Sequence, residues 1–211
     1  MESVKNFDAK IFFQKLKALE VKFFSSYSFQ ILFLLFVKIL FQFIILNSGY
    51  RWLSADDYCR TVKSFEWFQN PVIDSGVWLT PHFWLNGFAM FFVKDLFAAA
   101  TLVSIVFSGL TLIYFYNVTR IVFDMKTALY SSLIFCFFPF QVWLSVSGLP
   151  ESVFFFFIIA GIYYFIRWKF YGEKKIYLIL SAVSIALSNG FRYEGWLFSG
   201  VLVLLVLMDL L

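Results

Sequence analysis

Long, nearly uninterrupted runs of apolar residues recur along this chain and restrict its fold more than any other feature. About 20 apolar residues cross a lipid bilayer as a helix, and six runs approach that length. They are 29–47, 96–116, 127–144, 152–168, 176–191 and a last run from Trp196 to the C-terminus. The runs are continuous rather than alternating, which favours helices over membrane strands. We therefore predict an all-α fold, a polytopic transmembrane helix bundle with about six spans.

The composition excludes the classes of protein that live in water. Hydrophobic residues make up 62% of the 211 residues and charged residues only 14%, against about 25% charged in ordinary soluble domains. A soluble core of this length could not hide so much apolar surface, so a soluble globule, a coiled coil and a disordered chain are all excluded. The net charge of +4 is explained by membrane topology rather than by a nucleic-acid partner.

The basic residues of the loops orient the predicted bundle. Eleven lie on the side of the N-terminus and five on the other side, which places the N-terminus in the cytoplasm and the loop 49–95 outside. The eleven are Lys5, Lys10, Lys15, Lys17, Lys22, Arg120, Lys126, Arg167, Lys169, Lys174 and Lys175. The five are Arg51, Arg60, Lys63, Lys94 and Arg192. We expect a multi-pass protein of a bacterial-type inner membrane.

Two parts are expected. Residues 1–28 place Phe12, Leu16 and Phe23 at helical spacing among lysines, which is typical of a cytoplasmic amphipathic helix lying on the membrane. Residues 29–211 form the transmembrane domain. Because the chain stops within or just after an apolar run, we expect it to lack further C-terminal spans of a longer enzyme.

The loop 49–95 is long and rich in tryptophan, a residue that prefers the membrane interface. We predict an interfacial helix over Asp57–Gln69, ended by Pro71, and a second short helix beginning near Pro81. Within the first span, Lys38 and Gln42 are one turn apart, so we expect that polar stripe to face the bundle interior. For the run Phe154–Phe157, lipid-facing and groove-lining positions are both open.

An acidic pair, Asp56 and Asp57, opens the outer loop just after the first predicted span. Adjacent carboxylates repel each other and are costly to remove from water, so the pair has three interpretations. One carboxylate could act as a general base toward an acceptor hydroxyl. The two could bind a divalent cation beside a phosphate. Or they could begin a helix capped by Ser54, because acids in a first turn complement the helix dipole.

Four other polar residues belong to the same predicted side. Arg192 could hold a lipid phosphate by bidentate hydrogen bonds, or simply pair with Glu194. Glu151 and Glu194 could contact substrate or metal, whereas Glu151 could equally begin a helix. His82, the single histidine, could join the acidic pair around a metal, but a lone histidine is more commonly a packed or hydrogen-bonded residue. Neither cysteine has partners for a disulfide framework or a zinc site.

Four segments together resemble a known superfamily: 54–60 (SADDYCR, with Glu66 and Trp67 following), 81–87 (PHFWLNG), 147–151 (SGLPE) and 191–196 (FRYEGW). Over about 29–211 the chain resembles the GT-C superfamily of polytopic glycosyltransferases, in particular glycosyltransferase family 39. It is similar to lipid A aminoarabinose transferases and dolichyl-phosphate-mannose protein mannosyltransferases. The resemblance implies transfer of a sugar from a polyprenyl-phosphate donor on the outer face. It also implies that the first acid of the loop serves as catalytic base or metal ligand.

The leading hypothesis is therefore a membrane glycosyltransferase with a lipid, glycan or protein acceptor. Asp56 is the expected base, because we expect the loop helix to start at or after Asp57, leaving Asp57 to cap it or to pair with Arg60. Arg192 and Arg60 would hold the donor phosphate, with a divalent cation as a possible addition. A transporter or lipid flippase and an inert truncated membrane subunit are the alternatives.

Overall fold

The computed structural model describes residues 26–50, 54–71, 76–172 and 174–210, and it shows helices without any strand in those ranges. The elements are α2 (Tyr27–Asn47), α3 (Ala55–Gln69), α4 (Pro81–Ala89), α5 (Leu96–Val122), α6 (Met125–Phe137), α7 (Pro139–Leu144), α8 (Glu151–Tyr171), α9 (Ile176–Ser188) and α10 (Glu194–Leu210). The predicted amphipathic segment 1–28 falls almost entirely outside the described residues, so it stays a prediction.

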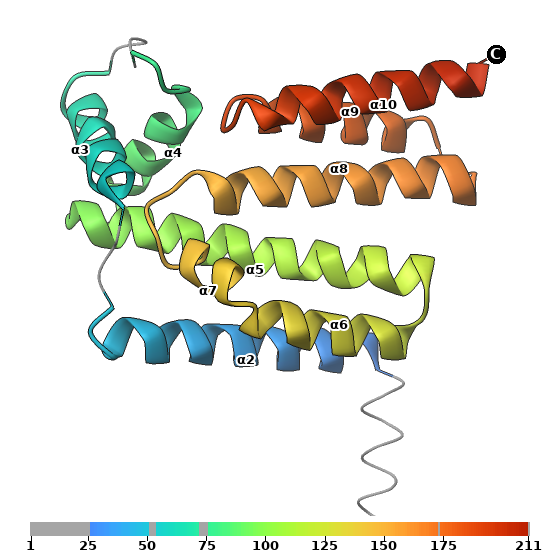
Figure 1. The fold of residues 1–211 in the computed structure, drawn as a ribbon, viewed down its shortest axis with the longest axis horizontal. Coiled ribbons are helices and arrows are strands. Elements are labelled where there is room, and N and C mark those ends of the chain that lie inside the picture. Colours follow the sequence, from blue (N-terminus) through green and yellow to red (C-terminus); the bar gives the residue numbers. More distant parts are fainter. Residues whose placement is uncertain (1–25, 51–53, 72–75, 173, 211) are drawn as a thin grey trace, which may run out of the picture.

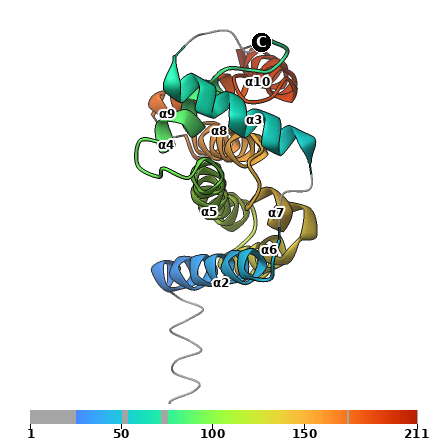
Figure 2. The same ribbon diagram turned by 90° about the vertical axis from the view of Figure 1, so that its left-hand side faces the viewer.

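The long helices run side by side, and two short ones cover one end of them (Figure 1). α5 packs against α8, α8 against α9, and α2 against both α5 and α6. α3 lies across the helix ends rather than along them, as Figure 2 shows. The end of the bundle that α3 crosses is the cap end. It comprises α3, α4, the α7–α8 loop (145–150) and the α9–α10 turn (189–193). The C-terminus lies at the opposite end (Figure 1).

Within the described ranges, three helices, α2, α5 and α8, are long and apolar enough to cross a bilayer. α6 and α9 are apolar but have 13 residues each, and α10 has 17. A helix occupies every predicted span, so the all-α membrane bundle is confirmed. The loops predicted to share a membrane side with the acidic pair do meet at one end of the bundle.

The predicted third span, 127–144, is not one helix. It is divided into α6 and α7 at Phe138, whose backbone is extended (φ −63°, ψ 118°). Pro139 explains the break, because proline disfavours helical geometry in the preceding residue and cannot donate a backbone hydrogen bond. The proline instead occupies the first position of α7, where no donor is needed.

α2 turns a polar stripe inward, as predicted. Gln30, Leu34, Lys38 and Gln42 recur every fourth residue and are buried, whereas its large apolar side chains are mostly exposed. Gln42 Nε2 donates to Ser108 Oγ at 2.9 Å, and Tyr116 donates to Gln30 Oε1 at 2.6 Å. This arrangement suits a helix whose outer surface faces lipid, because polar groups on that surface would lack hydrogen-bond partners.

The phenylalanine run of α8 packs inside the protein. Phe154 is buried, Phe156 meets Phe107 of α5 edge-on at 5.3 Å, and Phe157 stacks on Phe191 at 5.7 Å. These rings join α8 to α5 and to the α9–α10 turn, so the turn that carries Arg192 is fixed by aromatic packing.

The two cap helices form where the sequence predicts them, with one difference. α4 begins at Pro81 as expected, whereas α3 begins at Ala55, two residues before the predicted start. Gly87 allows α4 to approach α3, because a Cβ atom there would lie 2.4 Å from the Trp67 ring. α3 and α4 therefore act as one unit against the bundle.

Candidate active site

Three consecutive residues at the start of α3 face three different surroundings. Ser54 caps the helix, its hydroxyl accepting from Asp56 N at 3.2 Å, so the residues that follow have helical geometry. Each residue then turns about 100° from the last. Asp56 lines a small polar pocket, Asp57 is fully buried, and Tyr58 lines a large apolar pocket. The first turn of α3 thus separates two pockets of different character.

The polar pocket is a cavity of about 150 Å³ between α3, the segment before α4 and the α9–α10 turn. Its lining residues are Asp56, Arg60, Trp78, Leu79, Phe191, Arg192, Tyr193 and Glu194. The Arg60 guanidinium lies over the Trp78 ring, 5.0 Å from its centre, and its Nε is 3.9 Å from Asp56 Oδ2. Tyr193 donates to the Val77 carbonyl at 3.0 Å and so holds two walls together.

Arg192 is the most strongly paired residue of this pocket. Its Nε donates to Glu194 Oε2 at 3.0 Å and its Nη2 to Glu194 Oε1 at 2.5 Å, which makes a bidentate pair. Its Nη1 donates to Glu151 Oε1. Hydrogen bonding to Glu194 is the largest cause that raises the pKa of Arg192 above its ordinary value. The guanidinium therefore remains charged while its fork is occupied by carboxylates.

Asp57 points into the protein. Its Oδ1 accepts the backbone N–H of Gly148 at 2.9 Å, and its Oδ2 has no hydrogen-bond partner among the described residues. Burial raises the pKa of Asp57 from 3.8 to about 6, and the Gly148 hydrogen bond partly opposes that rise. This carboxyl group therefore titrates close to neutral pH.

His82 binds the same residue from the other side. Its Nε2 lies 3.0 Å from the Gly148 carbonyl oxygen, and because a carbonyl only accepts, Nε2 carries the proton. Burial lowers the pKa of His82 to about 3, so the ring is neutral at physiological pH. Asn86, one turn further along α4, lies 3.2 Å from the same nitrogen.

Asp57 and His82 together satisfy both backbone groups of Gly148. This clamp joins α3 and α4 to the α7–α8 loop, 91 and 66 residues away in the chain. Because Asp56 adjoins Asp57 and Glu151 follows the loop, the clamp sets the position of Asp56 relative to the Arg192 cluster (Arg192, Glu151 and Glu194). The acidic pair is thus divided: one acid contributes to the pocket, the other to its framework.

The Asp57–Arg60 pairing expected from the sequence is wrong. Asp57 was expected to cap α3 or to pair with Arg60, but Asp56 pairs with Arg60, because the two are four residues apart on one face. His82 is buried and hydrogen-bonded, the more common situation of a lone histidine, with its Nε2 bound to Gly148. The described residues contain no group of three or more His, Cys, Asp or Glu side chains placed to hold a metal ion. Asp56, Arg60, Glu151, Arg192 and Glu194 are brought together as the sequence suggested.

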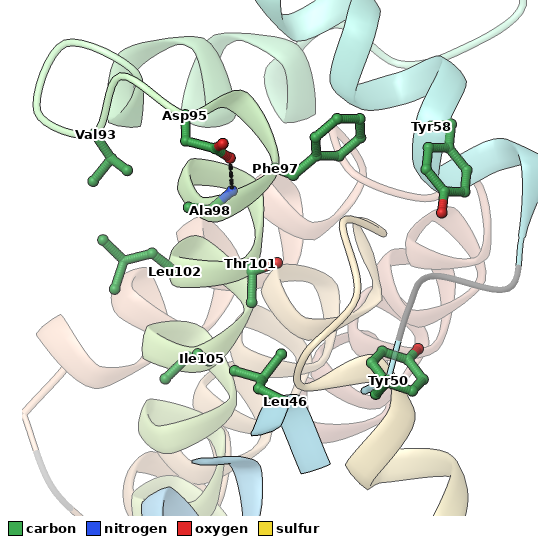
Figure 3. Close-up of a pocket in the computed structure, with 10 residues that line it drawn as sticks. All are labelled: Leu46, Tyr50, Tyr58, Val93, Asp95, Phe97, Ala98, Thr101, Leu102 and Ile105. Atoms are coloured by element: carbon green, nitrogen blue, oxygen red, sulfur yellow. Dashed lines mark hydrogen bonds between the residues drawn. The ribbon is translucent and has the colours of Figure 1, made fainter. Parts of the chain in front are cut away.

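The apolar pocket lies on the other side of α3 and is larger, about 700 Å³ (Figure 3). Its lining residues are Leu46, Tyr50, Tyr58, Val93, Asp95, Phe97, Ala98, Thr101, Leu102 and Ile105. Leu46 lies in the last turn of α2, and Ala98, Thr101, Leu102 and Ile105 lie in the first three turns of α5, so two spanning helices form its walls. Asp95 caps α5 by accepting from Ala98 N at 2.8 Å (Figure 3). Burial and the nearby Asp57 charge raise the pKa of Tyr50 to about 12.

Sequence reasoning missed the parts of the site that depend on distant contacts. Gly148 carries no reactive group, and its importance comes from its two backbone bonds. Trp78 is one of the tryptophans that mark the loop 49–95 as interfacial, but its ring also supports Arg60 and lies 5.8 Å from Lys63 Nζ. No pattern of spacing pairs these residues.

Comparison with known families, proteins and structures gave one match. A family profile for dolichyl-phosphate-mannose-protein mannosyltransferase matches residues 58–211, which begin directly after the acidic pair. The searches of curated proteins and of solved structures found no match. The matched segment covers most of the chain, including Arg60, His82 and the whole Arg192 cluster. With its apolar helix bundle and charged pocket, the chain belongs to the dolichyl-phosphate-mannose-protein mannosyltransferase family, membrane glycosyltransferases that use polyprenyl-phosphate sugar donors.

Proposed function

We propose that the polar pocket transfers a sugar from a polyprenyl-phosphate donor to an acceptor hydroxyl on the outer face of the membrane. One observation carries the proposal: the Asp56 carboxylate and the Arg192 guanidinium line the same small cavity. A base and a fixed cation on opposite sides of a reacting centre are what displacement at an anomeric carbon requires. Arg60 adds a second cation beside Trp78.

The proposed step balances within the two substrates. Asp56 accepts the proton of the acceptor hydroxyl as its oxygen forms a bond to the anomeric carbon. The bond from that carbon to the phosphate oxygen breaks, and the polyprenyl phosphate leaves with the electron pair. Arg192 and Arg60 stabilise the negative charge that grows on the phosphate. We propose that these arginines supply the positive charge, and that the apolar pocket holds an aliphatic segment of the lipid substrate.

Asp56 is more suitable as base than Asp57. Its side chain is 55% exposed, so it can exchange protons with a substrate, whereas Asp57 is fully buried and committed to Gly148. A positioned general base contributes about 10²–10⁴-fold in rate.

The test is a transfer assay on the full chain in lipid, with a polyprenyl-phosphate sugar. In Asp56→Asn, turnover should fall by about 10²–10⁴-fold while donor binding is retained. Glu66→Gln is the matched control, because it removes an exposed acid from α3 outside both pockets. Near-normal turnover in Asp56→Asn would refute the proposed base, and a larger loss in Asp57→Asn would transfer the role to Asp57.

The outer-face location has its own test, and the native chain provides the probe. Cys59 on α3 is exposed and Cys136 is buried. An impermeant thiol reagent should therefore label intact cells at Cys59, and labelling should disappear in Cys59→Ser. Tyr171, exposed at the opposite end of the bundle, gives the converse probe. In a Cys59→Ser background, Tyr171→Cys should react only after the membrane is opened; the reverse pattern would place the polar pocket in the cytoplasm.

A further inference from the structure

The Arg192 fork is already occupied in this structure, although it belongs to the pocket proposed to bind a phosphate. Glu194 takes both Nε and Nη2, the same two parallel bonds that a phosphate would make to an arginine. The remaining nitrogen, Nη1, is bound to Glu151. A phosphate can therefore form the side-on bidentate pair with Nε and Nη2 only by replacing the Glu194 carboxylate.

The two carboxylates differ in how easily they can leave. The Glu194 side chain is 54% exposed and lines the polar pocket, whereas Glu151 is 14% exposed. Releasing Glu151 would leave a charge in a poorly hydrated place, which is costly. Releasing Glu194 returns it to water, and its place in the first turn of α10 still favours a negative charge. Glu194 is thus the partner that can be exchanged.

We propose that Glu194 is a displaceable counter-ion that competes with the lipid phosphate for the Arg192 fork and thereby releases the product. The inference rests on the proposed function, because it assumes that Arg192 binds the donor phosphate. In the resting state Glu194 holds the fork. The donor phosphate displaces it, while Glu151 keeps the guanidinium in place.

The charge on the phosphate changes during the reaction, and this gives Glu194 its role. The donor is a phosphodiester with one negative charge, whereas the product is a monoester that carries between one and two at neutral pH. The product head group therefore binds a cation more tightly than the donor does. Because Glu194 is only two residues from Arg192, its carboxylate has a high effective concentration at the guanidinium. It can therefore bind Nε and Nη2 again, which opposes retention of the product.

The experiment measures binding of a polyprenyl phosphate to the full chain in lipid, with the polyprenyl alcohol of equal length as reference. In Glu194→Gln the neutral amide competes poorly, so the Kd for the phosphate should fall about tenfold. Steady-state turnover should then be inhibited by product at correspondingly lower concentration, while the first turnover keeps its rate. Glu194→Asp keeps the charge but shortens the side chain by one methylene. Its affinity for the phosphate should therefore lie between those of the wild type and Glu194→Gln.

Two controls separate the possible failures. Glu66→Gln removes one exposed negative charge from α3 outside the pocket and should leave the Kd unchanged. Arg192→Ala should lose the phosphate-dependent part of binding. If Arg192→Ala binds like the wild type, the phosphate site of the proposed function is wrong. If Arg192→Ala loses binding but Glu194→Gln binds no more tightly than the wild type, the role of Glu194 alone is refuted.

Discussion

The two pockets beside α3 share one helix turn but differ in almost every other respect. The polar pocket is about 150 Å³ and is lined by two arginines and two acids, whereas the apolar pocket is about 700 Å³ and is lined largely by aliphatic and aromatic side chains. The residues that separate them are consecutive: Asp56, Asp57 and Tyr58. Helical rotation sends neighbours about 100° apart, so one turn can serve charge on one side and lipid on the other.

Under the proposed function, the two pockets have different roles. Charge in a confined, polar cavity stabilises a developing anion, and such stabilisation is a large part of enzyme catalysis. An apolar pocket between two spanning helices offers a place for an aliphatic chain, and the described residues that line it include no cation that could stabilise a phosphate. The predictions below test whether the chemistry and the lipid contacts are separated in this way.

The largest effect on donor binding is expected in the polar pocket at Arg192. Arg192→Ala should weaken binding of the donor phosphate by about 10- to 150-fold, because a hydrogen bond to a charged group contributes about 1.5–3 kcal/mol. Arg192→Lys keeps the charge without the planar fork and should lose less. Equilibrium binding of the donor measures both. Arg120→Ala, at the far end of α5, is the control, and equal affinity in Arg192→Ala and wild type would assign Arg192 to structure alone.

The unfolding free energy of the protein should depend on pH through Asp57, which lies between the two pockets. Asp57 has a pKa of about 6 in the folded protein against 3.8 ordinarily, so the folded state holds its proton more tightly. Its contribution to the unfolding free energy is fully present below about pH 4 and is lost as the pH rises through 6, by up to about 3 kcal/mol. Asp57→Asn keeps an acceptor for Gly148 and should remove this dependence, making the variant more stable than wild type at pH 8.

Thermal unfolding in detergent at pH 4, 6 and 8 measures this difference, with Asp95→Asn as the control for loss of one carboxylate. Parallel profiles for Asp57→Asn and wild type would show that the Asp57 carboxyl group is not held protonated by its surroundings.

A smaller effect is expected in the apolar pocket. Ala98→Trp places a large ring among residues that line it and should weaken binding of a long polyprenyl phosphate about fivefold, equivalent to roughly 1 kcal/mol of apolar burial. A phosphate with a short prenyl chain should bind as before. Ile134→Trp, on an exposed surface of α6, is the control. Equal weakening of long and short chains would mean that the pocket does not hold the lipid chain.

The smallest effect should follow removal of divalent cations. Arg60 and Arg192 already bring positive charge to the polar pocket and pair with its acids. A transfer assay with EDTA should therefore retain its rate within about twofold, since the arginines supply the charge stabilisation. A large loss that Mg²⁺ or Mn²⁺ restores would show that a cation completes the site.

Much of the fold follows from local pattern. The apolar runs locate the helices, Pro81 begins α4, and the polar stripe of α2 faces inward as its four-residue spacing indicated. Local pattern also explains the miss at the third span, since Pro139 outweighs the apolar run around it. The candidate site was harder. The sequence placed its residues on one side of the membrane, but it gave no partner for Asp57, because no local signal relates Asp57 to Gly148.

The sequence by itself determined that this chain is a helical membrane bundle and that Asp56, Glu151, Glu194 and Arg192 gather at one end, because burial in lipid imposes long apolar helices whose loops alternate between two ends. Only the tertiary structure decided how Asp56, Asp57 and Tyr58 divide among a polar pocket, the core and an apolar pocket. The rotation of a short helix with polar residues on several faces is not set by its own pattern. Hydrogen bonds to a backbone 91 residues away set it, because burying the N–H of Gly148 requires the acceptor that Asp57 provides.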